Sequence, residues 1–242
     1  MRPNLRVKRN HLVSVDISAS QPTFLCVLAE EVRSGRIRGT VSGKREETGK
    51  ITPLSCTFLE DGSLLNRLER HVRCESWERL QNDIESGGLY ERIREAISKS
   101  EDGKEITLAN AKREALMAMF IQANRNTAGV KALRRLYRGP YHFLREMKRP
   151  AGTKPSQYNN WDVGDAKAHC KASHCLQWIE STFVFDTIIA RIMNERPDMF
   201  AATIHDAIVV EPENAAYVQG LIEDAFREKG IAVKLKIEDL SC

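Results

Sequence analysis

Two short apolar segments at opposite ends of the chain each carry one aspartate, and they constrain the fold more than any other feature. The first spans residues 13–18 (VSVDIS, with Asp16) and the second spans residues 203–210 (TIHDAIVV, with Asp206). Alternating and β-branched residues of this kind favour strands. Because strands must pair to satisfy their backbone groups, the two ends of the chain are expected to meet in one sheet.

The rest of the chain predicts an α+β fold, in which an antiparallel sheet with helices is interrupted in sequence by a helical insertion. A helix is expected from Ser20, with Pro22 in its first turn. The other expected elements are short helices over 63–99, helices over 106–124, 129–148, 163–195 and 213–229, and a last strand over 231–237. Gly230 is expected to cap the last helix. Residues 34–62 and 149–162 have the composition of a connector and a loop.

The charge is unevenly distributed along the 242 residues, which suit one large domain or two small ones. Residues 104–154 hold twelve Lys/Arg and three Asp/Glu, a net charge of 12 − 3 = +9. The whole chain carries +4, so the remainder sums to 4 − 9 = −5. A basic segment in an acidic body indicates a polyanion-binding face, with a solvated helical surface as the alternative.

Nothing in the composition indicates secretion or a membrane. No apolar run reaches the length of a membrane span, and residues 1–9 lack the apolar core of a secretory signal. The six cysteines are scattered and show no framework of short spacings. Reduced thiols in a cytoplasmic protein with no membrane partner are therefore the expected state.

Two side-chain sets on the expected helix 163–195 allow more than one interpretation. One set is apolar and is expected to lie in the core: Phe183, Phe185, Ile188 and Ile192. The other has the side chains of a zinc site: His169, Cys170, His174 and Cys175. On a helix only Cys170 and His174 share a face, and a tetrahedral site normally draws ligands from two segments. Ordinary helix residues are the favoured interpretation.

The chemistry-bearing residues are the two strand aspartates and a lysine between them. A lone carboxylate on an apolar strand is costly to bury, so Asp16 and Asp206 are expected to be paired or metal-bound. Two carboxylates brought together from distant segments can hold two divalent metals for phosphoryl transfer. Lys112, on the expected central helix, is suited to hold the phosphates being transferred.

These segments resemble the motifs of family A DNA polymerases and of single-subunit, phage-type RNA polymerases. The stretch 16–21 (DISASQ) is similar to the first palm motif, and 112–120 (KREALMAMF) is similar to the fingers-helix motif. Residues 204–206 (IHD) resemble the His-Asp hairpin motif, and Gln177 resembles the glutamine of the helix along the primer–template. The resemblance implies a polymerase-type palm in residues 1–35 and 163–242. Residues 36–162 would then form a connector and a fingers-like insertion.

The resemblance implies a role for each matching residue. Asp16 and Asp206, with the carbonyl of Ile17, would hold two Mg²⁺ ions, with Mn²⁺ as an alternative ion. Lys112 would bind the incoming nucleoside triphosphate. The remaining substrate-binding positions are Phe120 at the base or sugar, His205 at the primer terminus, Gln177 in the minor groove, and Gln21 and Arg113 at the nucleotide.

Four positions depart from the family patterns. Ala207 stands where DNA polymerases usually have glutamate, and a small residue there is closer to the RNA polymerases. Leu108 replaces an arginine that usually precedes the fingers lysine, and Arg113 lies on a different helix face. At the sugar-gating position, Gln21 is bulky enough to disfavour a ribose 2′-hydroxyl, and Phe120 lacks the hydroxyl of the RNA polymerases. Together Gln21 and Phe120 favour deoxynucleotides.

The leading hypothesis is a template-directed nucleotidyltransferase of bacterial, phage or mobile-element origin, acting on a primer–template. Only fifteen residues precede Asp16, whereas the family's thumb lies upstream of this motif. We therefore expect a distributive enzyme whose thumb comes from a partner protein or an upstream domain, with Arg2, Arg6, Lys8 and Arg9 contacting phosphates. The alternatives are an inactive palm that binds nucleic acid in a replication or mobile-element complex, and an RNA polymerase or primase. A two-metal nuclease would be expected to show more acidic ligands.

Overall fold

The two ends of the chain meet in one antiparallel sheet, as the strand patterns predict. The computed structural model describes residues 11–36, 62–100, 105–149 and 170–240. The sheet has the order β2-β3-β1-β4. Its strands are β1 (Val13–Ile17), β2 (Ala201–Ile204), β3 (Ala207–Val210) and β4 (Leu235–Asp239). The α+β class is confirmed, and the N-terminal strand β1 lies between two strands from the C-terminal part.

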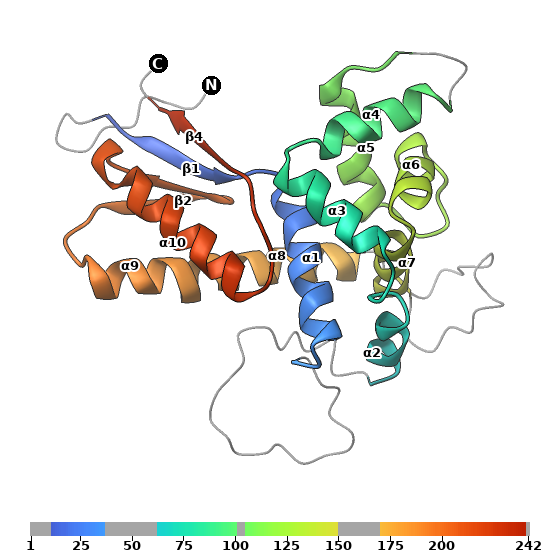
Figure 1. Cartoon of the computed structure of the whole chain (residues 1–242), viewed down its shortest axis with the longest axis horizontal. Coiled ribbons are helices and arrows are strands. Elements are labelled where there is room, and N and C mark those ends of the chain that lie inside the picture. The colour runs from blue at the N-terminus through green and yellow to red at the C-terminus, as the bar shows by residue number, and fades with distance from the viewer. Residues whose placement is uncertain (1–10, 37–61, 101–104, 150–169, 241–242) are drawn as a thin grey trace.

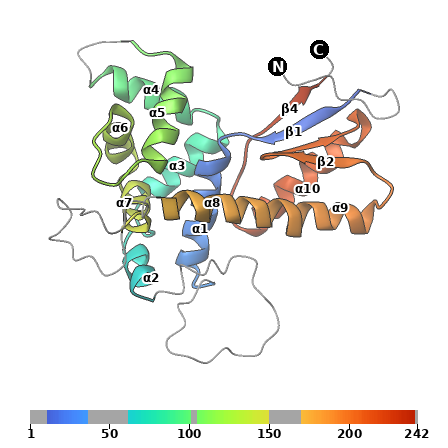
Figure 2. The same ribbon diagram turned by 180° about the vertical axis from the view of Figure 1, so that it is seen from behind.

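Helices that flank the sheet bury its apolar residues. They are α1 (Ser20–Arg33), α8 (Cys170–Thr182), a π-helical segment (Phe183–Ile189), α9 (Ala190–Glu195) and α10 (Ala215–Glu228). Figure 2 shows α8 to α9 running as one long helix that passes from α7 to the far end of the sheet. Phe183 contacts Phe24 of α1 and Phe226 of α10, with ring centroids 5.5 and 4.4 Å apart. This aromatic cluster fixes the three helices together.

The helical insertion lies on the other side of α1 from the sheet (Figure 1). It comprises α2 (Gly62–Glu69), α3 (Ser76–Glu85), α4 (Leu89–Ser98), α5 (Leu108–Phe120), α6 (Ala128–Leu136) and α7 (Arg138–Met147). Thr107 and Thr127 cap α5 and α6 by accepting hydrogen bonds from the backbone at Asn110 and Val130. Their side chains explain why both helices begin where they do.

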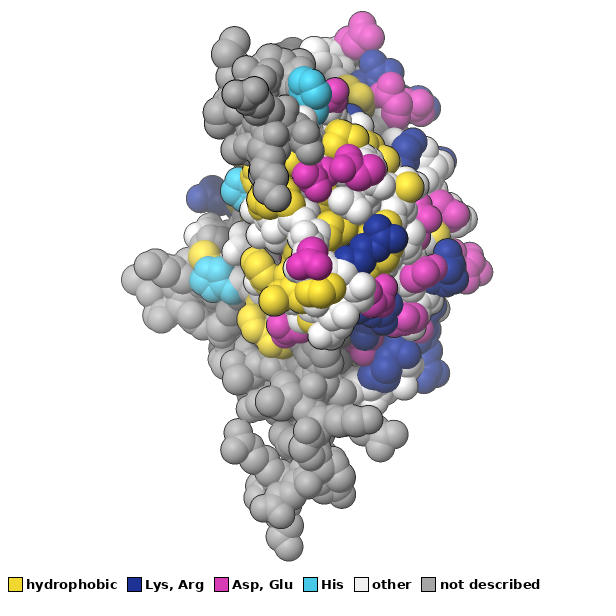
Figure 3. Space-filling model, turned by 90° about the vertical axis from the view of Figure 1, so that its left-hand side faces the viewer, with side chains coloured by type: hydrophobic (Ala, Val, Ile, Leu, Met, Phe, Trp, Pro, Cys, Tyr) yellow, Lys and Arg dark blue, Asp and Glu magenta, His cyan; other side chains and the backbone are white. Residues whose placement is uncertain are grey.

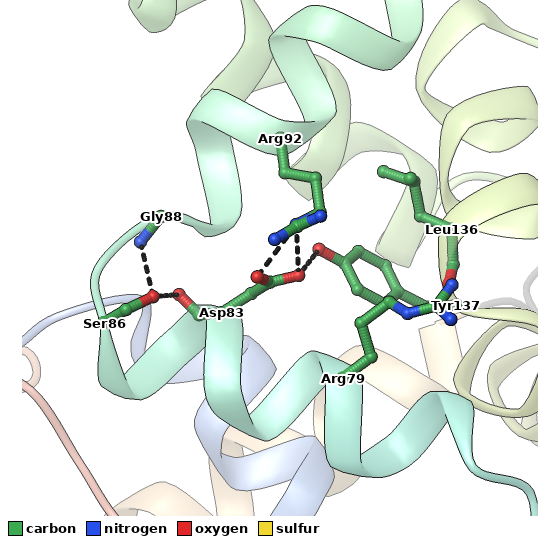
Figure 4. Close-up of polar contacts among 7 residues, drawn as sticks. All are labelled: Arg79, Asp83, Ser86, Gly88, Arg92, Leu136 and Tyr137. Carbon is green, nitrogen blue, oxygen red and sulfur yellow. Dashed lines mark hydrogen bonds and ion pairs between the residues drawn. The ribbon is translucent and has the colours of Figure 1, made fainter.

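A buried polar network joins three parts of the insertion (Figure 4). The carboxylate of Asp83 on α3 accepts a hydrogen bond of 2.7 Å from the Tyr137 hydroxyl and one of 2.8 Å from Arg92 Nε on α4. Asp83 and Tyr137 are both buried. Burial and the neighbouring carboxylate raise the pKa of the Tyr137 phenol, so it donates as a neutral group.

Two helix predictions in the insertion were wrong in extent. The expected helix 106–124 ends at Phe120, and the expected basic helix 129–148 is two helices that break at Tyr137, where φ is −130° and ψ is 64°. Pro140 supplies the reason, because its ring would clash with the carbonyl of residue 136 in a continuous helix. Residue 136 is the last residue of α6.

The C-terminal elements follow the predicted order with shifted bounds. Gly230 has a φ of +75°, and its amide and that of Ile231 bond to the carbonyls of Arg227 and Phe226, as in a Schellman motif. The last strand was expected at 231–237 but begins at Leu235. Its ladder can start only where β1 offers a partner, and that partner is Ile17.

One expected core residue is exposed. Phe183, Ile188 and Ile192 are buried as predicted, but the side chain of Phe185 is 50% exposed. Two residues beyond Phe183 on a helix, it points to the opposite side. Met193 of α9 is also exposed. A view of the sheet end of the molecule shows hydrophobic side chains gathered on that face (Figure 3). Among the described helices, none has the length and apolar composition needed to cross a bilayer.

Candidate active site

A cleft of about 870 Å³ opens between the sheet and helices α4 and α5. Five of the residues predicted from the sequence line it: Asp16, Ile17, Gln21, Lys112 and Asp206. They come from β1, the start of α1, the helical insertion and the β2–β3 hairpin. The fold therefore brings into one cavity these five residues from three separate sequence motifs.

The sheet register sets the surroundings of Asp16. Asp16 lies opposite Ala207 of β3 and opposite Lys236 of β4, so the three side chains share one face of the sheet. Ala207 is buried, and Lys236 forms an ion pair with Glu238 on its own strand. Asp206 immediately precedes Ala207 in the hairpin turn, which places the two aspartates at the ends of neighbouring strands.

Backbone strain is concentrated beside the two aspartates. Among the described residues, Ala19 and His205 are the only non-glycine residues with a positive φ, and their φ values are 53° and 55°. Ala19 follows Asp16 in the turn into α1, and His205 precedes Asp206 in the hairpin. A left-handed conformation costs a non-glycine residue roughly 1–2 kcal/mol. Strain of this kind often accompanies functional sites.

The N-terminus of α1 and three lysines give the cleft a region suited to anions. Residues 18–20 line the cleft, and α1 has neither a side-chain cap nor an acidic residue in its first turn. Its first backbone amides and the helix dipole therefore favour a negative group. Lys112, Lys234 and Lys236 also line the cleft. Lys234 donates a 3.1 Å hydrogen bond to the Ser86 carbonyl, which links the β4 end of the sheet to the insertion.

Tyr90 of α4 is a cleft residue that the sequence did not single out. Its ring lies 5.7 Å from Lys112 Nζ, within cation–π range. Burial, and then the negative charge of Asp206, raise the pKa of the Tyr90 hydroxyl to about 12. The hydroxyl is buried and has no hydrogen-bond partner among the described residues. Only its position just after Gly87-Gly88, a turn signal, marks it in the sequence.

Glu180 of α8 is the second residue missed from the sequence. Its carboxylate accepts a hydrogen bond from Ser20 Oγ and one of 2.6 Å from Gln21 Nε2. Burial is the main cause that raises the pKa of Glu180, and the charge of Asp206 acts in the same direction. Glu180 therefore lies near Asp206 as well as against α1. It stands on a helix face between buried residues, and no local pattern distinguishes it.

The other predicted residues lie outside this cleft. Phe120 and Arg113 line a second groove of about 740 Å³ along α5, which Lys112 also borders. His205 is exposed at the hairpin turn, and Gln177 is exposed on α8. Leu108, at the first turn of α5, is 49% exposed and lines the main cleft. Ala109, Lys112 and Leu116 line both cavities, so this face of α5 connects them.

The hard oxygen donors that line the cleft suit magnesium. Mg²⁺ in phosphoryl-transfer sites is typically bound by one or two carboxylates together with substrate phosphates and water. Asp16 and Asp206, with the backbone at Ile17, supply that donor set in one cavity. The described residues contain no cluster of three or more His, Cys, Asp or Glu arranged to hold a metal. In the zinc-like set, Cys175 is buried while His174 is exposed, and His169 lies outside the described residues.

Part of the predicted basic segment consists of exposed basic residues. Lys148 is buried and donates to the Ala118 carbonyl at 2.8 Å, and Arg149 pairs with Glu146. The segment also has seven exposed basic residues that form no ion pair with a described carboxylate: Lys112, Arg113, Arg125, Lys131, Arg134, Arg135 and Arg138. Lys104 and Lys154 lie outside the described residues, as do the N-terminal basic residues.

Comparisons with known proteins add little to this geometry. No protein-family model matches the chain, and no curated protein matches it in sequence. One similar solved structure is described as the POL domain of Pol1 from M. smegmatis in complex with DNA primer-template and dNTP. The match has 10% sequence identity and a TM-score of 0.36, and it covers 95% of this chain and 39% of that one. A TM-score at this level does not establish a common fold.

Proposed function

We propose that the protein is a template-directed nucleotidyltransferase that adds nucleotides to a primer 3′-hydroxyl. The observation that carries the proposal is the convergence of Asp16, Asp206 and Lys112 on one cleft. In this proposal residues 1–35 and 163–242 are a polymerase-type palm. Residues 36–162 are the connector and the fingers-like insertion.

Each cleft residue has a role in the proposed reaction. Asp16 and Asp206, with the Ile17 carbonyl, would hold two Mg²⁺ ions. When bound, such ions activate the attacking hydroxyl and neutralise charge on the phosphates. Lys112 and the N-terminus of α1 hold the triphosphate from two sides, and the Lys112 ammonium is stabilised over the Tyr90 ring. Because these groups come from separate elements around one cleft, together they would orient the nucleotide for the reaction.

The exposed basic residues of α5 to α7 are proposed to contact the nucleic-acid backbone. Each such contact releases counterions, so binding should weaken steeply as salt rises. Gln177 and His205 are exposed and available to contact the primer–template, and Phe120 offers a half-buried ring in the groove that Lys112 also borders. Without a thumb among the described elements, a partner or a further domain would supply the grip on the duplex.

A second candidate function is a nucleic-acid-binding subunit whose palm has lost activity. Two observations favour it. Ala207 is fully buried beside Asp16, so no further carboxylate is available at that position. Leu108 presents an apolar side chain to the cleft at the start of α5, where the polymerases carry a cation.

Primer extension distinguishes the two functions. The full chain is tested with Mg²⁺ and with dNTPs or NTPs separately, on DNA and on RNA templates. Asp16→Asn and Asp206→Asn should each abolish extension. Asp198→Asn, which changes an exposed aspartate outside the cleft, should leave it unchanged. Extension that survives either cleft substitution contradicts the proposal, and salt-sensitive binding without any extension supports the second function.

A further inference from the structure

Glu180 has contacts that none of the proposed roles uses. Its carboxylate bridges two consecutive residues at the start of α1, accepting from Ser20 Oγ through Oε1 and from Gln21 Nε2 through Oε2. Ser20 and Gln21 both line the cleft that contains the aspartates. The bridge therefore connects α8 to Gln21, a side chain that lines the cleft.

The bridge also determines which way the Gln21 amide faces. Gln21 donates to Glu180 through Nε2, so the NH₂ group of its amide points to Glu180. Its carbonyl Oε1 faces away, and it is buried without a hydrogen-bond partner among the described residues. A buried acceptor left without a partner is destabilising. The contact with Glu180 has to be strong enough to hold the amide in this costly orientation.

Ser20 makes the bridge rigid. A single hydrogen bond would leave the Glu180 carboxylate free to turn about its terminal torsion. Donation by Ser20 to Oε1 and by Gln21 to Oε2 fixes both oxygens at once. The two hydrogen bonds offset the rotamer entropy that a fixed glutamine loses.

We propose that Glu180 is a positioning residue that holds Gln21 immobile against the sugar of the incoming nucleotide. This inference rests on the proposed function. A bulky side chain excludes a ribose 2′-hydroxyl only if it cannot turn aside. A free glutamine has three side-chain torsions through which it can move, whereas the hydrogen bond to Glu180 restricts all three in the bridged one. Sugar selection is thus controlled from α8, outside the motif that contains Gln21.

The test compares two matched carboxylates. Glu180→Ala removes the bridge. Glu223→Ala removes the 2.9 Å hydrogen bond that Gln219 Nε2 donates to Glu223 Oε1 on α10, outside the cleft. The measurement is the ratio of kcat/KM for dNTP to kcat/KM for NTP in primer extension. We expect Glu180→Ala to lower this ratio about tenfold, within the range that steric fit of a hydroxyl supplies. Glu223→Ala should not change it.

Two further variants serve as controls. One tests whether the effect of Glu180→Ala comes from misfolding, and the other tests whether it acts through Gln21. Glu180→Gln keeps the side-chain shape but only one full acceptor, so its ratio should lie between those of the wild type and Glu180→Ala. In a Gln21→Ala background, Glu180→Ala should have no additional effect on the ratio, because the residue it positions is gone.

The outcomes separate the inference from the proposed function. If the wild type extends primers and Glu180→Ala lowers kcat/KM for both sugars equally, Glu180 is merely structural and the inference is overturned while the proposed function stands. An effect of Glu180→Ala that persists in the Gln21→Ala background also overturns it. If the wild type neither extends primers nor binds either triphosphate, the proposed function fails and the inference fails with it.

Discussion

Lys148 allows a quantitative test of how the insertion holds helix α5, which carries Lys112. The Lys148 side chain is almost fully buried at the end of α7, and its Nζ donates to the carbonyl of Ala118 in the last turn of α5. Burial lowers the pKa of Lys148 from 10.5 to about 7. The charged form is therefore disfavoured in the folded protein but not in the unfolded chain.

The sign of the pH dependence follows from this difference. Between pH 7 and pH 10.5 the unfolded chain keeps a proton on Lys148 that the folded protein has lost, so the free energy of unfolding rises with pH in this window. Each pH unit in the window adds about 1.4 kcal/mol. Because the folded lysine is still half protonated at pH 7, the gain from pH 7 to pH 9 is about 2 kcal/mol.

The assay is urea unfolding of the wild type and of Lys148→Met at pH 7, 8 and 9. Methionine has a side chain of similar length that does not titrate. The Lys148→Met variant should therefore lack the rise in the free energy of unfolding that Lys148 causes between pH 7 and pH 9. His71 and His142, whose pKa values are also lowered by burial, are neutral across this range and cancel in the comparison. We expect the wild type to gain about 2 kcal/mol relative to Lys148→Met. Equal pH profiles for the two proteins would refute the reasoning, because Lys148 would then stay charged when folded.

Three further substitutions test the site and its support. Tyr137→Phe should cost about 1–3 kcal/mol of unfolding free energy, because buried Asp83 loses a hydrogen-bond donor; an unchanged urea midpoint would contradict this. His205→Gly should add roughly 0.5–1 kcal/mol to the free energy of unfolding, because glycine tolerates the positive φ at this position. It should also slow primer extension, because the side chain proposed to contact the primer–template is lost. A lower free energy of unfolding would show that the turn is not strained. Tyr90→Phe should keep the contact with Lys112 and leave thermal stability unchanged or higher, since the buried hydroxyl has no partner among the described residues; a lower melting temperature would argue against this.

Local patterns predicted the sheet residues well. The alternating apolar residues around Asp16 and the tight turn at His205-Asp206 are short-range signals, and the structure has a strand and a hairpin at those places. The Schellman end at Gly230 is equally local. The extents of helices were less predictable. The break at Tyr137 depends on Pro140, three residues further on, within a segment whose helical periodicity continues across it.

The groups missed in the cleft share one cause. Tyr90 and Glu180 take their place from contacts between elements far apart in sequence, such as Glu180 with Gln21. Their own neighbourhoods look like ordinary amphipathic helix. The separation of Phe120 and Arg113 from the aspartates has the same origin, because the orientation of α5 decides which of its faces lines the cleft.

The sequence by itself determined which strands could form, where the hairpin turns, and that aspartates from both ends of the chain stand on those strands. These features follow from side-chain periodicity and from the demand of every strand for a hydrogen-bonded partner. Only the tertiary structure decided that Lys112 and Tyr90 face Asp16 and Asp206, and that Glu180 holds Gln21. Those contacts depend on how helices pack against the sheet and against each other, which no local pattern encodes.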